Sequence, residues 1–279
     1  MKTHEPAQQI PIHRPRKGPW LQLFTARGFE WNSATLPIGG LHRGLEGLRI
    51  LQLSDLHIRA RWDRAHDELI RRTRDNPPDL ILYCGDVLEH KFDQHAAIAT
   101  MQKLLGALPS RLGGFAILGN HDGDLITPHF GLCGVTMLND QLARVEHSGA
   151  DIEIIGFRGI SRRDLHDVVI AGMPPRKPGA LRLVMTHFPD SVTRLASLGA
   201  DVIFTGHTHG GQVCLPGGWP PIRHDSLPRR MCQGIHRVGG SWLVVSRGFG
   251  FATWPVRLFC AAEVLEITLA PAEGQAGAR

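Results

Sequence analysis

The chain has 279 residues, of which 42% are hydrophobic and 20% charged, and its formal net charge is +5 at pH 7. This composition excludes a disordered or fibrous protein, and the length allows one large domain with a substantial core. The small positive excess is compatible with anionic partners. No spacing typical of a nucleic-acid-binding motif accompanies it, so no nucleic-acid partner is expected.

The N-terminal region and the cysteines bear on the compartment. Five scattered cysteines with no CxxC pair argue against a disulfide framework and favour a reducing environment. Prolines, Arg14, Arg16 and Lys17 interrupt the first thirty residues, which lack the apolar core of a signal peptide or a membrane span. A cytoplasmic location is therefore predicted. The basic stretch and the apolar residues 20–24 indicate an irregular arm, which packs on the domain or touches an anionic bilayer as a peripheral contact.

From residue 47 onward, apolar runs alternate with amphipathic stretches. Residues 47–55, 78–86 and 113–124 are predicted strands, and 61–76 and 93–109 are predicted helices. The strands are apolar throughout, which is typical of a sheet covered on both faces.

The second half is richer in strands. A hairpin turning at Ser148 and Gly149 is predicted, followed by four more strands within residues 180–190, 200–211, 240–250 and 257–269. The pattern predicts an α/β fold in which two mixed sheets pack together and are flanked by helices. We expect an N-terminal arm over 1–46, one domain over 47–270 and a tail over 271–279.

Polar residues follow the ends of five predicted strands. They are Asp55, His57, Asp86, Asn120, His121, His187, His207 and His209. Ligands collect outside the carboxyl ends of strands in such sheets, so five loops are expected to converge on one crevice. Oxygen and imidazole donors without a thiolate suit divalent metals such as Mn, Fe, Zn or Ni.

Taken singly, these units differ in what they indicate. "SDLH" and "GD" are equally typical of helix caps and turns, and "GNHD" is compatible with a turn carrying a capping Asn. "GHTHGG" is the strongest single indication of metal ligands. Alternate residues of an extended chain point to opposite sides, so His207 and His209 reach different ions only if the strand has become a loop. Gly206, Gly210 and Gly211 allow that loop.

The five units, in this order, resemble the calcineurin-like metallophosphoesterase superfamily over about residues 47 to 269, with the pattern D-x-H, GD, GNH(D/E), H and GHxH. The small bacterial phosphodiesterase type is the nearest, since "GHTHGGQ" is followed by "SRGFG" and "PVRLF". The resemblance implies two divalent ions, of Mn, Fe, Zn, Ni or Co. It assigns Asp55, His57 and His209 to the first ion, Asn120, His187 and His207 to the second, and Asp86 to both.

The resemblance also implies in-line attack on phosphorus by a water or hydroxide that bridges the ions. It gives His121 the role of protonating the leaving oxygen or contacting the phosphoryl group, with Asp122 orienting it. Glu89 is expected in the surrounding shell. The arginines considered for phosphate contact are Arg158, Arg162, Arg163, Arg223 and Arg257, although solvation of helices and loops explains most of them equally well.

A phosphodiesterase is the first functional expectation. The alternative is a UDP-2,3-diacylglucosamine pyrophosphatase of lipid A synthesis at the membrane surface. It is favoured if the aromatic residues Trp219, Phe249, Phe251 and Trp254 form an apolar slot beside the metals, and not if they only cap the core. A major group of those enzymes carries Arg where this chain has His121, which argues against membership of that group. A metallo-β-lactamase-type hydrolase would need HxHxDH, which "HTHGGQ" lacks. A catalytically silent protein of the same fold is the non-enzyme alternative.

Overall fold

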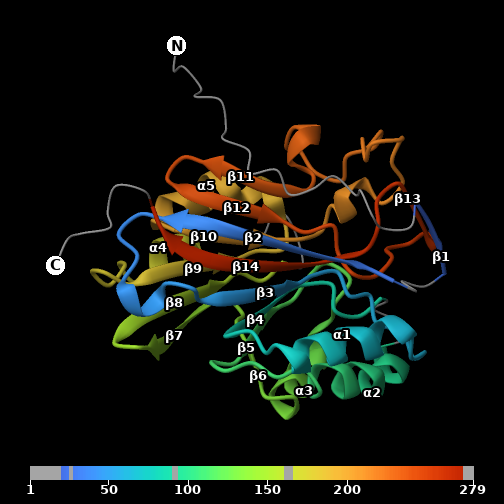
Figure 1. Ribbon diagram of the computed structural model, residues 1–279, viewed down its shortest axis with the longest axis horizontal. Coiled ribbons are helices and arrows are strands. Elements are labelled where there is room, and N and C mark those ends of the chain that lie inside the picture. Colours follow the sequence, from blue (N-terminus) through green and yellow to red (C-terminus); the bar gives the residue numbers. More distant parts are fainter. Residues whose placement is uncertain (1–19, 25–27, 90–93, 160–165, 273–279) are drawn as a thin grey trace.

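The computed structural model describes residues 20–24, 28–89, 94–159 and 166–272, and within them two six-stranded sheets lie face to face (Figure 1). The first sheet has the order β2 (Glu30–Ile38), β14 (Glu263–Pro271), β3 (Arg49–Leu53), β4 (Leu80–Cys84), β5 (Gly114–Ile117) and β6 (Val135–Met137). The second has the order β11 (Gly234–Val238), β12 (Ser241–Val245), β10 (Val202–Thr205), β9 (Leu181–Met185), β8 (Ala150–Gly156) and β7 (Gln141–His147). A separate ribbon pairs β1 (Leu21–Leu23) with β13 (Val256–Leu258).

Helices cover the outer face of each sheet. The structure has α1 (Arg64–Asp75), α2 (Gln94–Leu105) and α3 (Thr127–Leu132) on the first sheet, and α4 (His166–Gly172) and α5 (Val192–Leu195) on the second (Figure 1). In α1, Ala65 and Leu69 are buried, while the arginines of the other face are exposed or only partly buried. A capping box between Asp63 and His66 starts this helix.

The central core lies between the two sheets. It joins Ile50, Leu82 and Leu265 of the first sheet to Leu183 and Phe204 of the second. Strands such as β4 are buried at every position because one face meets the other sheet and the other meets helices.

The predicted two-sheet α/β fold is confirmed. The predicted hairpin is confirmed too: His147 pairs with Ala150, and both turn residues have the positive φ that a tight two-residue turn requires.

Among the described residues before 47, those from Glu30 to Ile38 form a regular strand. β2 runs parallel to β14 over nine residue pairs, from Glu30 with Glu263 to Ile38 with Pro271. The boundary placed at residue 47 thus divides a continuous sheet. The expected tail lies mostly outside the described residues, as do residues 1–19.

Candidate metal centre

Five strands deliver the candidate residues to one place. β3, β4 and β5 are parallel in one sheet, and β9 and β10 are parallel in the other, so their carboxyl ends lead into neighbouring loops. The side chain of Gln52 donates to the carbonyl of Thr205 at 2.8 Å, which ties β3 to β10 just before those loops. All seven predicted ligands lie in this region.

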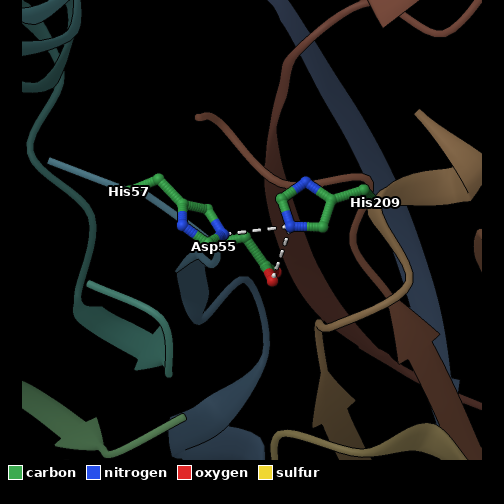
Figure 2. Close-up of side chains that lie close together, drawn as sticks. All are labelled: Asp55, His57 and His209. Carbon is green, nitrogen blue, oxygen red and sulfur yellow. Dashed lines mark hydrogen bonds and ion pairs between the residues drawn. The ribbon is translucent and has the colours of Figure 1, made fainter. Parts of the chain in front are cut away.

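The first cluster consists of Asp55, His57 and His209, all buried (Figure 2). Nε2 of His209 lies 3.1 Å from Nε2 of His57 and 3.3 Å from Oδ1 of Asp55. Two imidazole nitrogens and a carboxylate oxygen thus face a common point.

The second cluster consists of Asp86, His187 and His207, with Asn120 between the two imidazoles. Oδ1 of Asn120 lies 3.1 Å from Nε2 of His187 and 2.9 Å from Nδ1 of His207. Oδ2 of Asp86 is 3.2 Å from Nε2 of His187 and 3.7 Å from Nε2 of His57, so this carboxylate lies between the clusters.

Backbone conformation at these residues is unusual. Asp55, His57, Asp86, His207 and His209 all have φ between 43° and 67°, in the left-handed region that residues with a Cβ seldom adopt. Such conformations concentrate at functional sites, where the surrounding structure holds them in place. The ligand residues thus share the left-handed turns with two of the glycines expected there, Gly210 and Gly211, whose φ values are 61° and 94°.

The glycines serve close approach. A Cβ on Gly206 would collide with the side chains of Ser54 and Asp55, and a Cβ on Gly119 would collide with Asp86. The carboxylates of Asp55 and Asp86 also accept hydrogen bonds from the backbone of other loops. His207 donates its backbone N–H to Asp55 at 3.0 Å, and His121 donates its backbone N–H to Asp86 at 2.7 Å.

The buried charges are strongly coupled. Burial alone would raise the pKa of Asp55 and Asp86, but the neighbouring histidines outweigh it and hold both pKa values far below the usual range. Burial would lower the pKa of His187, yet Asp86 and Asp55 raise it to about 9. Burial dominates at His209, whose pKa falls to about 4 despite Asp55.

The donor set fits divalent metal ions. Two imidazole nitrogens at 3.1 Å beside a carboxylate that stays ionised form an oxygen and nitrogen pocket suited to a cation. The second cluster repeats this chemistry with one amide oxygen added.

Comparison with known proteins agrees with this geometry. Residues 48–211, more than half of the chain, match the family model described as calcineurin-like phosphoesterase. The chain belongs to the calcineurin-like phosphoesterase family. The predicted recognition is thereby confirmed, and the protein is a metal-dependent phosphoester hydrolase.

Three relatives illustrate the range of the family. The metallophosphoesterase YkoQ of Bacillus subtilis is 28% identical over 78% of this chain and 82% of its own. The phosphodiesterase YaeI of Escherichia coli is 28% identical over 79% of this chain and 82% of its own. The UDP-2,3-diacylglucosamine pyrophosphatase LpxG of Chlamydia trachomatis is 26% identical over 71% of this chain and 72% of its own. Together with the two clusters, the family indicates a dinuclear divalent metal centre. Within the described residues, no helix is long and apolar enough to cross a membrane.

Glu89 stands beside the first cluster of this phosphoesterase. Its Oε2 is 3.0 Å from Nδ1 of His57, and its Oε1 is 3.2 Å from Arg59. A carboxylate on the far nitrogen orients a ligating imidazole and raises its basicity. This is the surrounding position expected for Glu89.

The carboxylate of Asp122 has partners other than the ring of His121 in the structure. Its carboxylate accepts the backbone N–H groups of Val87, Leu88 and Gly119 at 2.9 to 3.2 Å, while Nδ1 of His121 lies 3.0 Å from the carbonyl oxygen of Glu89. These three backbone N–H groups satisfy the buried carboxylate of Asp122, so it does not bond to the ring of His121. Asp122 joins the loop after β4 to the loop after β5. Burial and Asp86 nevertheless raise its pKa to about 6.

Two of the arginines considered for phosphate contact, Arg158 and Arg223, have partners within the protein. Arg158 pairs with Asp124, and Arg223 donates to the carbonyl of Leu227. Arg162 and Arg163 lie outside the described residues.

Arg257 is buried, not exposed to substrate. Its Nη2 lies 3.1 Å from Nδ1 of His209 and donates to the carbonyls of Arg247 and Gly250 at 2.8 and 2.6 Å. Arg257 therefore joins the loop that carries His209 to the loop after β12. The sequence "PVRLF" contains Arg257, but a single arginine beside a strand gives no indication that its side chain is buried.

A pocket of about 300 Å³ opens beside His57. Its apolar lining includes Phe24, Leu56, Ile58, Phe249 and Phe251. Arg59, Arg61 and Asp63 also line it, and the two arginines pair with Glu89 and Asp63. Of the four aromatics singled out in the sequence, Phe249 and Phe251 line this pocket and are buried, whereas Trp219 and Trp254 are exposed.

Proposed function

We infer that the protein is a phosphodiesterase that uses two divalent metal ions. This proposal rests on two oxygen and nitrogen clusters, the first buried and the second partly buried at His207, with Asp86 between them. A relative of similar length, YaeI, is named a phosphodiesterase, which supports the same substrate class.

In this proposal seven residues hold the metals. Asp55, His57 and His209 hold one ion, Asn120, His187 and His207 hold the other, and Asp86 contributes to both. Bound divalent ions supply a water of lowered pKa as nucleophile and positive charge for the phosphoryl oxygens. Manganese, iron, zinc, nickel and cobalt all suit this donor set.

His121 is the proposed general acid. It lies next to the ligand Asn120, its ring stands edge-on to that of His57 at 4.9 Å, and its Nδ1 faces the Glu89 carbonyl. A carbonyl oxygen only accepts, so Nδ1 carries a proton and donates it to Glu89. To act as a general acid the ring therefore carries a second proton on Nε2, which passes to the leaving oxygen and leaves the neutral ring protonated on Nδ1.

A lipid-linked substrate such as UDP-2,3-diacylglucosamine is the second candidate. The pocket favours it, because apolar side chains lie beside the metal ligand His57. A substrate with an apolar group close to its phosphate would place the phosphate at the metal ligands and the apolar group in this pocket. LpxG carries the corresponding name, which supports this alternative.

An assay with three substrates tests the proposal. A bis-aryl phosphodiester, an aryl monophosphate and UDP-diacylglucosamine are compared with Mn, Co, Ni or Zn added. Asp86→Asn removes the carboxylate between the clusters, and Asp151→Asn on β8 is the matched control, since Asp151 pairs with Lys177 away from the site.

We expect the diester to be hydrolysed faster than the monoester, Asp86→Asn to abolish turnover, and Asp151→Asn to retain it. Preference for UDP-diacylglucosamine would select the second candidate. No turnover of any substrate with any metal would contradict the enzyme proposal.

A further inference from the structure

The β1–β13 ribbon has an inverted pattern of side chains. The outward residues of the paired strands are apolar, with Leu21 opposite Leu258 and Leu23 opposite Val256. The inward residues are Gln22 and Arg257, both buried. A sheet with one face in water normally turns its polar residues outward, so this ribbon has the opposite arrangement.

A neighbouring segment extends the same outward face. Val213 pairs with Leu258, and Leu215 pairs with Trp219. Paired residues on neighbouring strands lie on the same side of a sheet. We call the set Leu21, Leu23, Val213, Leu215, Trp219, Val256 and Leu258 the apolar ribbon face. Its members are exposed or half-buried.

Exposed aromatics border this face. Trp20 contacts the ring of Phe259 at 5.9 Å between centroids, and the side chains of Phe24 and Trp254 are 67% and 70% exposed. Grouped apolar exposure of this kind marks a surface that meets an apolar partner. Tryptophan is enriched where proteins meet the headgroup region of a bilayer.

Basic residues accompany the apolar ones. Arg223 and Arg230 are exposed in the segment 213–231, and Arg229 lies 5.0 Å from the ring of Trp219. The single acidic residue of that segment, Asp225, is buried and accepts backbone N–H groups of Asp190 and Leu227. In the sequence, Arg14, Arg16 and Lys17 stand three to six residues before Trp20. Positive charge beside exposed aromatics complements an anionic membrane surface.

The apolar ribbon face also adjoins the metal site. Phe24, which directly follows β1, lines the pocket beside His57, and Arg257 on the inward side of β13 contacts His209. A surface that rests on a bilayer here would bring the pocket close to the lipid headgroups.

We propose that the apolar ribbon face is a membrane-docking surface whose partner is an anionic phospholipid bilayer. This proposal concerns the surface to which the protein binds and not the bond that it cleaves. Vesicle binding can therefore succeed or fail independently of phosphodiesterase activity.

Co-sedimentation with lipid vesicles tests the proposal. The full chain should bind phosphatidylcholine vesicles that contain phosphatidylglycerol, bind pure phosphatidylcholine more weakly, and lose affinity as salt is raised. The double change Leu23→Ser with Trp254→Ser should weaken binding about tenfold or more, because each removes a large apolar contact. Vesicles should also slow hydrogen exchange of the amides in 21–24 and 254–258.

Val168→Ser is the matched control. Val168 is 71% exposed on α4, which lies at the opposite end of the molecule from β13 in Figure 1. Circular dichroism should show every variant folded. The proposal is overturned if anionic vesicles do not bind, or if Val168→Ser weakens binding as much as the double variant. It is also overturned if light scattering shows a dimer that only the double variant dissociates, since the face would then bind a second copy.

Discussion

Replacing Arg257 by methionine should destabilise the whole protein. The guanidinium is buried and donates from Nε to the carbonyl of Gly250 at 2.9 Å, and from Nη2 to the carbonyls of Arg247, Gly248 and Gly250 at 2.6 to 3.1 Å. Methionine fills part of the space but leaves these carbonyls without a donor.

The magnitude follows from those contacts. A hydrogen bond to a charged group contributes about 1.5–3 kcal/mol, and bonds that share one guanidinium are not additive. If two of them act independently, Arg257→Met should lower the free energy of unfolding by about 3–5 kcal/mol. Arg257→Lys should recover only a part, because an ammonium group cannot reproduce the planar fork.

Guanidinium denaturation followed by circular dichroism measures this loss. Arg71→Met is the control, since Arg71 is exposed on α1 and pairs with Glu68 and Asp75 there, and its midpoint should hardly move. A loss below about 1 kcal/mol for Arg257→Met, within the range of surface substitutions, would refute the assignment of Arg257 as a buried link between loops.

Three further predictions concern the site. His121→Ala should lower turnover far more than metal content, and equal losses of both, measured by kinetics and elemental analysis, would argue against a general acid. Asp122→Ala should lower the free energy of unfolding by about 2–3 kcal/mol, because buried backbone donors lose their acceptor; an unchanged denaturation midpoint would contradict this. The pKa of His187 is raised from 6.5 to about 9, so in the metal-free protein its stabilising contribution is complete below pH 6.5 and is lost as pH rises through 9. Denaturation midpoints across that range should fall more steeply for the native chain than for His187→Gln, in which other groups such as His57 still titrate; equal slopes would count against the His187–Asp86 pair.

The sequence predicted the two-sheet architecture because its strands are continuous apolar runs that end in polar residues. It did not predict β2, whose residues 30–38 mix Glu, Asn, Ser and Thr with apolar residues. β2 is an edge strand with few buried positions, so its place depends on pairing with β14 and not on its own pattern.

The site was predictable to the level of which residues come together. The loops that converge follow strand ends, and strand ends are visible in the sequence. The left-handed backbone at Asp55 and His209 was not predictable, because an Asp or His adopts that conformation far less readily than glycine and so gives only a weak local signal.

Two roles required three-dimensional contacts. Asp122 was expected to orient its neighbour His121, but its carboxylate satisfies backbone donors from another loop. Arg257 was expected to face phosphate, but the inverted ribbon turns it inward to His209. Sequence adjacency does not report which way a side chain points.

X-ray diffraction from a manganese-loaded crystal, collected at the manganese absorption edge, tests the central claim most directly. Two anomalous peaks about 3.5 to 4 Å apart are predicted, with Asp86 in contact with both. One should lie among Asp55, His57 and His209, and the other among Asn120, His187 and His207. Absence of both peaks in the loaded protein, or peaks bound to other residues, would contradict the dinuclear centre.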